Sequence, residues 1–243
     1  MYGADLTEIH DLIHESRGKD YGAEARELTR RVRRLRPDAR SLLDVACGTG
    51  AHLRHFAGLF DAVAGLELSE PMVRAARRAL PDVPVHTGDM RAFDIDARFD
   101  VVTCMFGSLG YATTEAELHA ALAAFARHLT PGGVVAVDPW WFPETYLDGH
   151  VSADVTTVAG RTVARVSHSA REGEACRMDV HYVVADAQGG ARHFTETHRI
   201  SLFPRTAYEK AFRAAGLTVV YVPGPHSGRG LFLGAAPRDR ATA

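Results

Sequence analysis

The feature of this chain that most constrains its fold is a regular alternation of short apolar runs and helix-like segments between residues 41 and 137. The apolar runs, which we predict as strands, cover residues 41–45, 62–68, 83–87, 99–106 and 134–137. The helices predicted between them cover residues 51–59, 71–80 and 114–129. Strands that are apolar along their length and alternate with helices indicate a parallel sheet covered on both faces.

The segments before and after this alternation show other patterns of apolar residues. Two helices are predicted before the alternation begins, over residues 5–16 and 20–36. After Pro139, an alternation with period two indicates an antiparallel meander whose strands cover residues 156–166, 177–186 and 193–202. The chain is then predicted to end with a helix over 204–215 and an antiparallel pair over 218–222 and 230–234.

These elements together predict an α/β fold: a doubly wound, mostly parallel seven-stranded sheet with a terminal antiparallel strand and an inserted antiparallel β meander. We expect a single domain over residues 1–243. Its expected segments are a helical cap (1–37), a cofactor-binding core (38–139), an inserted substrate-binding sheet (140–203) and a completion of the core (204–237).

Composition excludes several classes of protein. With 28 Lys and Arg against 30 Asp and Glu, the net charge is −2, and a protein that binds nucleic acid through its phosphates would usually be basic. Three widely spaced cysteines, Cys47, Cys104 and Cys176, suggest no disulfide framework and fit a reducing cytoplasm. No apolar run approaches the ~18 residues that a membrane span needs, and the histidines show no metal-ligand spacing, so we expect neither a membrane protein nor a metal site.

A glycine-rich loop, Asp44-Val-Ala-Cys-Gly48-Thr49-Gly50, follows the first predicted strand and opens a helix. Glycines at such a turn let the backbone approach a ligand closely. A dinucleotide fingerprint would need a third small residue where Leu53 stands, which weakens the alternative of an NAD-dependent oxidoreductase. Taken alone, the loop could also be a plain tight turn.

Polar residues at the ends of the next two strands narrow the choice of cofactor. Glu67 ends the second predicted strand, where a carboxylate can accept hydrogen bonds from both ribose hydroxyls. Asp89 and Met90 follow the third, where the carboxylate can accept an adenine amino proton and the thioether can pack on the ring. The set resembles that of class I S-adenosylmethionine-dependent methyltransferases over residues 40–139.

This resemblance implies S-adenosyl-L-methionine as the cofactor. It places Gly48 and Gly50 beside the methionine portion, Glu67 at the ribose, and Asp89 with Met90 at the adenine. The full set of expected cofactor-binding residues is Tyr21, Asp44, Ala46, Gly48, Gly50, Glu67, Leu68, Asp89, Met90 and Met105.

Five further stretches are more specific than the cofactor loop. They begin at Arg17 (Arg-Gly-Lys-Asp-Tyr), Ser41 (Ser-Leu-Leu-Asp-Val-Ala-Cys-Gly-Thr-Gly), Asp138 (Asp-Pro-Trp-Trp-Phe-Pro-Glu), Arg165 (Arg-Val-Ser-His-Ser) and Ser227 (Ser-Gly-Arg-Gly-Leu-Phe). Together they resemble the sugar N,N-dimethyltransferases of antibiotic biosynthesis, of the desosamine and mycaminose type, over residues 2–234. The resemblance implies a dTDP-linked amino deoxysugar, a 3-amino-3,6-dideoxyhexose, that is methylated twice on one nitrogen.

The residues themselves support a second ligand. Arg165, Ser167 and Ser169 share one face of a strand, and Arg177 on the next strand could approach the same surface. Two arginines with hydroxyl donors suit a pyrophosphate, although a solvated sheet face would have the same pattern. The full set of expected substrate-binding residues is Tyr2, Tyr111, Trp140, Trp141, Arg165, Ser167, His168, Ser169, Arg177 and Arg229.

One position departs from the family pattern. After the fourth strand the 3-amino-sugar enzymes carry a His facing the amino sugar, and Tyr111 occupies that position here. A phenol can orient an amine but is a poor base near neutral pH, so a 4-amino sugar stays open. Tyr2, Tyr21 and Tyr111 are the candidates to orient the amine or relay its proton.

Other functions also stay open at this stage. The chain could methylate another small amine, or it could be a non-catalytic module that binds the adenosyl cofactor. A homodimer is equally open.

Overall fold

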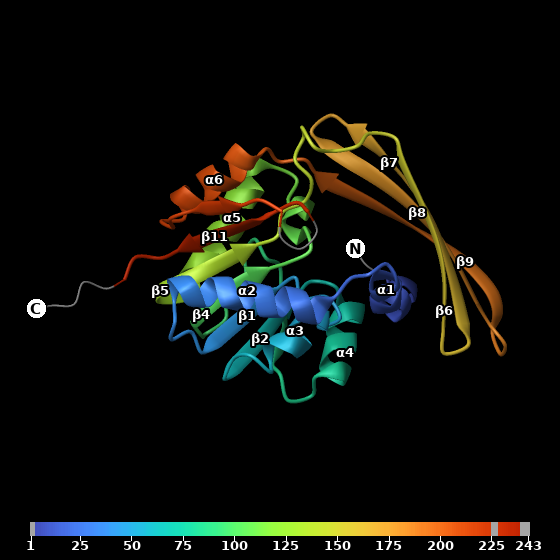
Figure 1. The fold of residues 1–243 in the computed structure, drawn as a ribbon, viewed down its shortest axis with the longest axis horizontal. Helices are drawn as coiled ribbons and strands as arrows, with labels where there is room; N and C mark the ends of the chain where they lie inside the picture. Colours follow the sequence, from blue (N-terminus) through green and yellow to red (C-terminus); the bar gives the residue numbers. More distant parts are fainter. Residues whose placement is uncertain (1–2, 225–227, 239–243) are drawn as a thin grey trace, which may run out of the picture.

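The computed structural model of the chain describes residues 3–224 and 228–238 and contains two sheets (Figure 1). The larger sheet has seven strands in the order β10-β11-β5-β4-β1-β2-β3. Their bounds are Ser41–Val45 (β1), Ala62–Glu67 (β2), Val85–Thr87 (β3), Phe99–Cys104 (β4), Leu129–Val137 (β5), Val220–Val222 (β10) and Leu231–Ala235 (β11). Strands β1 to β5 pair in parallel, and β11 is antiparallel to both β5 and β10, which confirms the predicted sheet.

Helices cover both faces of this sheet because consecutive strand residues point in opposite directions. Leu42 packs in one core and Leu43 in the other. Helices α2 (Tyr21–Leu35), α3 (Ala51–Phe56) and α4 (Glu70–Ala79) cover the first face. Helices α5 (Glu115–Arg127) and α6 (Arg205–Ala214) cover the second. The apolar runs therefore have no polar face, as expected for a doubly wound fold.

The second sheet is a four-stranded antiparallel meander between β5 and α6. Its strands are β6 (His150–Val158), β7 (Arg161–Glu172), β8 (Ala175–Asp186) and β9 (Gly190–Ser201). Helix α1 (Ala4–Ser16) lies against one face, which we call the inner face, and packs Ile9 and Ile13 against Val180 and Tyr182. Figure 1 shows α1 between α4 and this sheet. The division of the chain into one domain with four segments stays a prediction.

Two local predictions were wrong. The predicted strand 156–166 is a hairpin, because Ala159 and Gly160 take positive φ values of 50° and 77° and reverse the chain between β6 and β7. Ala159 is not a typical turn residue, so composition does not mark this turn. The strand predicted over 134–137 begins earlier, at Leu129 (β5), and its pairing with β4 shifts register between Phe99 and Val101.

The arrangement of the sheets decides where a ligand can bind. Strand β1 lies between β2 and β4, so successive connections leave the sheet in opposite directions at the carboxyl end of β1. Open α/β sheets bind ligands at such a switch point. Here that edge faces α1 and the inner face of the four-stranded sheet, which together close it off from one side.

Candidate active site

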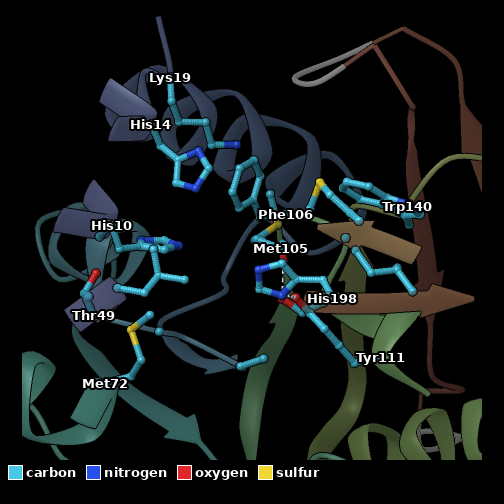
Figure 2. A pocket seen from close by; sticks show the side chains of 18 of the residues that line it. His10, His14, Lys19, Thr49, Met72, Met105, Phe106, Tyr111, Trp140 and His198 are labelled. Atoms are coloured by element: carbon cyan, nitrogen blue, oxygen red, sulfur yellow. Dashed lines mark hydrogen bonds between the residues drawn. The ribbon is translucent and has the colours of Figure 1, made fainter. Parts of the chain in front are cut away.

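A cavity of about 1020 Å³ lies between the carboxyl edge of the seven-stranded sheet and the inner face of the meander (Figure 2). Its lining residues come from α1, from the loops after β1, β2, β3 and β4, and from strands β6 to β9. The volume is at the upper end of the usual range for small-molecule sites, ~300–1,000 Å³, and leaves room for two ligands side by side.

The loop after β1 forms one wall of the cavity. Ala46 and Gly48 take positive φ values of 55° and 58°, and a Cβ placed on Gly48 would meet no atom within 4 Å. Asp44 is buried below the loop and accepts a hydrogen bond from the Thr103 hydroxyl at 2.8 Å. Burial raises the pKa of Asp44 to about 6, so a cation bound beside it would favour the ionised form.

Gly50 does not line this cavity, contrary to the prediction. Gly50 is the N-cap residue of α3 and has a φ of 85°. A Cβ on Gly50 would lie 3.0 Å from the side chain of Leu80, just after α4, and 3.5 Å from that of Ala76 in α4. The glycine is therefore needed for packing between the loop and α4, a role that a motif of spaced glycines does not distinguish from ligand contact.

Glu67 holds the loops together at the end of β2. Its Oε2 accepts the N–H of Gly48 at 2.9 Å, and its Oε1 accepts those of Leu68 and Ser69 at 2.9 and 2.8 Å. A carboxylate offers about four lone-pair sites, so capacity for a ligand hydroxyl remains. Glu67 is thus both a structural anchor and a cavity-lining acceptor with about one lone-pair site left, and its predicted role at both ribose hydroxyls stays a prediction.

The loop after β3 carries a fixed carboxylate. Asp89 accepts the backbone N–H and the Nε–H of Arg91, both at 2.9 Å, and Arg91 also donates to Glu117 at 2.7 Å. The hydrogen bond from Arg91 lowers the pKa of Asp89 and keeps it ionised. Met90 lines the cavity beside it, together with Met72 of α4. The assignment of Asp89 and Met90 to adenine stays a prediction.

Charged and aromatic side chains from the α1–α2 loop, α2 and α3 close the cavity near the end of β4. The Nζ of Lys19 lies 2.7 Å from Oε2 of Glu24 and 4.0 Å from the centre of the Phe106 ring. His52 donates through Nε2 to the same Glu24 oxygen at 2.8 Å, and the Tyr21 ring meets the His52 ring edge-on at 4.8 Å. Tyr21 thus lies in the predicted site, and Met105 lines it at the end of β4.

Arg165, Ser167 and Ser169 line the opposite wall, as predicted from strand alternation. Arg165 is only 7% exposed, and its Nη1 lies 3.9 Å from Asp154. Among the described residues, that Nη1 has no hydrogen-bond partner. A buried guanidinium N–H on a cavity wall is suited to an anionic ligand.

The predictions for His168 and Arg177 were wrong. Strand register places Met178 opposite Ser169 and Arg177 opposite Ala170. Arg177 therefore lies on the outer face with His168, where it is 51% exposed and pairs with Asp179 at 3.1 Å. One residue of register moves a side chain to the other face, and the sequence does not give that register.

Arg229 is buried where β5 ends. Its Nε donates to the carbonyl of Pro139 at 2.8 Å, and its Nη2 lies 3.4 Å from Oδ2 of the fully buried Asp138. The guanidinium carbon lies 5.0 Å from the centre of the Trp140 ring and 5.6 Å from that of Trp141. Both tryptophans are half-buried and line the cavity, as predicted.

Tyr111 lines the cavity with its hydroxyl 3.0 Å from Nδ1 of His198 (Figure 2). Three histidines that were not among the predicted site residues, His10, His14 and His198, line the same cavity. Their signal was present but weak: His198 shares strand alternation with Ile200, and His10 and His14 are one helical turn apart. The predicted Tyr2 lies outside the described residues.

Within residues 3–224 and 228–238, no three His, Cys, Asp or Glu side chains gather to hold a metal ion. Over the same ranges, no helix is long and apolar enough to cross a membrane.

Comparison with known proteins gives this cavity a context. Residues 42–133 match a family model described as a methyltransferase domain. A dTDP-3-amino-3,4,6-trideoxy-alpha-D-glucopyranose N,N-dimethyltransferase of Streptomyces venezuelae is 58% identical, over 96% of this chain and 99% of its own. A dTDP-4-amino-2,3,4,6-tetradeoxy-D-glucose N,N-dimethyltransferase of Saccharopolyspora spinosa is 47% identical, over 96% and 94%.

Solved structures agree with these relatives. DesVI of Streptomyces venezuelae superposes with a TM-score of 0.93 at 57% identity, covering 97% of this chain and 100% of its own. CalS10, a SAM-bound amino pentose methyltransferase of Micromonospora echinaspora, gives 0.87 at 47% identity, covering 93% and 96%. The glycine loop, Glu67 and the open space at Gly48 fit the same cofactor. This chain therefore belongs to the family of S-adenosylmethionine-dependent dTDP-amino-sugar N,N-dimethyltransferases.

Proposed function

We propose that this chain transfers methyl groups from S-adenosylmethionine to the amino nitrogen of a dTDP-linked amino deoxysugar, and that it does so twice. The observation that carries the proposal is a single continuous cavity. One of its walls holds the cofactor loop and Glu67, and the facing wall holds Arg165 and two serines. Both reactants can therefore occupy one enclosed space, with the reacting atoms between the walls.

The nucleotide end of the substrate fits the meander. Arg165 lines the cavity and has an Nη1 without a hydrogen-bond partner among the described residues, and Ser167 and Ser169 on the same strand face add hydroxyl groups. This combination matches the oxygen atoms of a pyrophosphate. Trp140 and Trp141 at the end of β5 offer aromatic surface for the thymine base, and Arg229 keeps both rings in place through its contacts with them.

The residues near the end of β4 position the reactants and need supply no nucleophile. The cofactor, when bound, supplies an electrophilic methyl group for attack by the neutral amine. Met105 and Phe106 form an apolar floor that excludes water, and Phe106 holds a strained φ of 62° beside it. Tyr111 can orient the amine by a hydrogen bond. Alignment of this kind is worth roughly 7–11 kcal/mol in favourable cases.

We further propose the amine at carbon 3 of the sugar. The relative with 58% identity is named for a 3-amino sugar, and the one with 47% is named for a 4-amino sugar. The presence of Tyr111, where the 3-amino-sugar enzymes carry a histidine, does not change this choice, because a phenol and an imidazole can both accept a hydrogen bond from an amine.

Mass spectrometry of products tests the proposal directly. The purified chain is incubated with S-adenosylmethionine and a panel of dTDP-3-amino and dTDP-4-amino sugars. We expect mono- and then dimethylated 3-amino product, and slower reaction of the 4-amino sugars. Cofactor binding without methylation of any amine would favour the non-catalytic module, whereas binding of NAD instead would favour the oxidoreductase.

We also propose a homodimer and a cytoplasmic location. Four valines, Val151, Val155, Val166 and Val183, lie on the outer face of the meander with exposed fractions of 62, 74, 49 and 44%. A second copy packed on this face would bury them. Light scattering of the wild-type chain and of Val155→Lys tests this: we expect a dimer that Val155→Lys dissociates. The three free cysteines are consistent with a reducing compartment.

A further inference from the structure

The short 3₁₀ helix after β4, η1 (Ser108–Tyr111), lies directly on the last strand of the meander. A Cβ on Gly110 would overlap the Cγ2 of Ile200, so only a glycine allows this approach. The Ser201 hydroxyl donates to the Ala112 carbonyl at 2.6 Å just beyond η1. The two segments are far apart in the chain, yet these contacts fix their relative position.

Docking of η1 on β9 places two polar side chains together inside the cavity. His198 precedes Ile200 by two residues and shares its face of the strand. The Tyr111 hydroxyl lies 3.0 Å from Nδ1 of His198, with ring centres 6.2 Å apart and planes at 66°. Figure 2 shows the pair facing the space between Met105 and His10.

The imidazole of His198 is uncharged near neutral pH. The residue is 7% exposed, and burial lowers its pKa to about 4, with the positive charge of Arg165 adding to the effect. A neutral imidazole has one donor and one acceptor nitrogen. The Tyr111–His198 contact can therefore run in either direction, and the two directions have different consequences for an amine.

Resting on the proposed function, we infer that His198 is a positioning residue whose Nδ1 accepts the hydrogen bond of the Tyr111 hydroxyl. This turns the lone pairs of the phenol oxygen toward the cavity, where they accept an N–H of the substrate amine. The nitrogen lone pair then stays free to attack the methyl group. In the opposite arrangement, the Tyr111 O–H would donate to that lone pair and block the attack.

The Tyr111–His198 contact also concerns how a tyrosine can serve where the 3-amino-sugar enzymes carry a histidine. A tyrosine at this position is able to donate to an amine as well as to accept from it, and only the second mode is productive. Because His198 accepts the O–H of Tyr111, the phenol cannot donate that hydrogen to the amine, which would be the unproductive mode. The same constraint holds for the secondary amine of the second transfer, which has one N–H left to donate.

A kinetic double-mutant cycle tests the coupling on the purified full chain, with the dTDP-3-amino sugar as substrate. His198→Leu should lower kcat/KM roughly two- to tenfold, the loss of one neutral hydrogen bond, chiefly through kcat. His198→Asn, which can place an acceptor oxygen near the position of Nδ1, should recover most of the loss. In a Tyr111→Phe background, His198→Leu should cost nothing more. His181→Leu, on the outer face of the same sheet, is the matched control.

Fully additive losses in this cycle would overturn the inference, because His198 would then act independently of Tyr111. A second readout needs no activity: ¹⁵N NMR of the histidine rings in the intact chain, with His198 identified from the spectrum of His198→Asn. We expect an unprotonated Nδ1 whose shift changes in Tyr111→Phe. A proton on Nδ1 would contradict the inference, whereas a wild-type chain that methylates no amino sugar would contradict the proposed function.

Discussion

The two walls of the cavity differ in how completely their polar groups are paired. On the cofactor side, the carboxylate of Glu67 already accepts three backbone N–H groups, and Asp89 is held by Arg91. On the substrate side, Arg165 keeps a buried Nη1 without a hydrogen-bond partner among the described residues. The polar groups of the first wall are thus paired within the protein, whereas the second wall keeps a donor that a ligand could pair.

This difference follows from how each wall is made. The cofactor wall consists of loops that directly follow adjacent parallel strands, so backbone N–H groups and a carboxylate meet over short chain distances. The substrate wall is one face of an antiparallel sheet, where the register decides which side chains point inward. Substitutions on the cofactor wall should therefore lower the affinity for the cofactor, whereas substitutions on the other wall should lower the affinity for the sugar nucleotide.

The largest expected effect concerns Arg229, which is buried at the end of β5 beside Asp138 and the two tryptophans that line the cavity. Arg229→Ala removes the guanidinium from the buried Asp138 and should lower the free energy of unfolding by about 3–5 kcal/mol, as for a broken buried ion pair. Denaturant unfolding measures this. As control, Arg213→Ala, in an exposed helix pair with Glu209, should change stability by at most about 0.5 kcal/mol. An unchanged stability, with only the KM of the sugar nucleotide raised, would make Arg229 a pure ligand residue.

Arg165 tests the unpaired wall alone. Arg165→Met keeps an unbranched apolar side chain and removes the guanidinium, so the affinity for the sugar nucleotide should fall by about 1.5–3 kcal/mol, roughly ten- to a hundredfold. Calorimetry with dTDP and with S-adenosylmethionine separates the two ligands, and cofactor affinity should stay the same. Arg177→Met, on the outer face, is the matched control and should change neither. Equal losses in both variants would place the pyrophosphate elsewhere.

Glu67 tests the paired wall. In Glu67→Gln the side-chain amide brings an NH₂ group against backbone N–H groups that the carboxylate now accepts. We expect cofactor affinity to fall by about 1.5–3 kcal/mol while dTDP affinity is unaffected. Titration calorimetry on the folded variant, checked by circular dichroism, gives both numbers. Normal cofactor affinity would remove Glu67 from the cofactor site.

The smallest expected effect is a pH dependence on the cofactor side. The pKa of Asp44 is raised to about 6 by burial, and the positively charged cofactor favours its ionised form. Cofactor affinity should therefore be constant above pH 6 and fall, by up to about tenfold per pH unit, as pH drops below it. Asp44→Asn should bind more weakly and flatten the profile.

The same raised pKa acts on stability with the opposite sign. Because it lies above the value of about 3.9 in the unfolded chain, the contribution of Asp44 to stability is present below pH 4 and is lost as pH rises through 6. Near pH 4 the carboxyl is protonated in the folded chain and resembles the amide of Asp44→Asn, so thermal unfolding of the two proteins should differ least there, and the difference should grow in favour of Asp44→Asn as pH rises through 6. If the stabilities of the two proteins changed with pH in parallel, the raised pKa of Asp44 would be contradicted.

Particular residues show how far the sequence could be interpreted. The strands β1 to β5 and the positions of Asp44, Glu67 and Asp89 at their ends were predicted, because an apolar run followed by a polar residue marks a strand end. Gly50 was misassigned because a glycine needed for packing looks like one needed for a ligand. Arg177 and His168 were misassigned because strand register depends on the partner strand.

The sequence by itself determined the α/β fold, the cofactor class and the family, since each rests on local pattern: apolar periodicity, a glycine turn and motifs of contiguous residues. Only the tertiary structure decided which face of the meander lines the cavity, that Arg229 is paired with Asp138, and that His198 meets Tyr111. These facts depend on contacts between segments that are distant in the chain, through sheet register and the docking of η1 on β9. A single sequence carries no record of such contacts until the chain has folded.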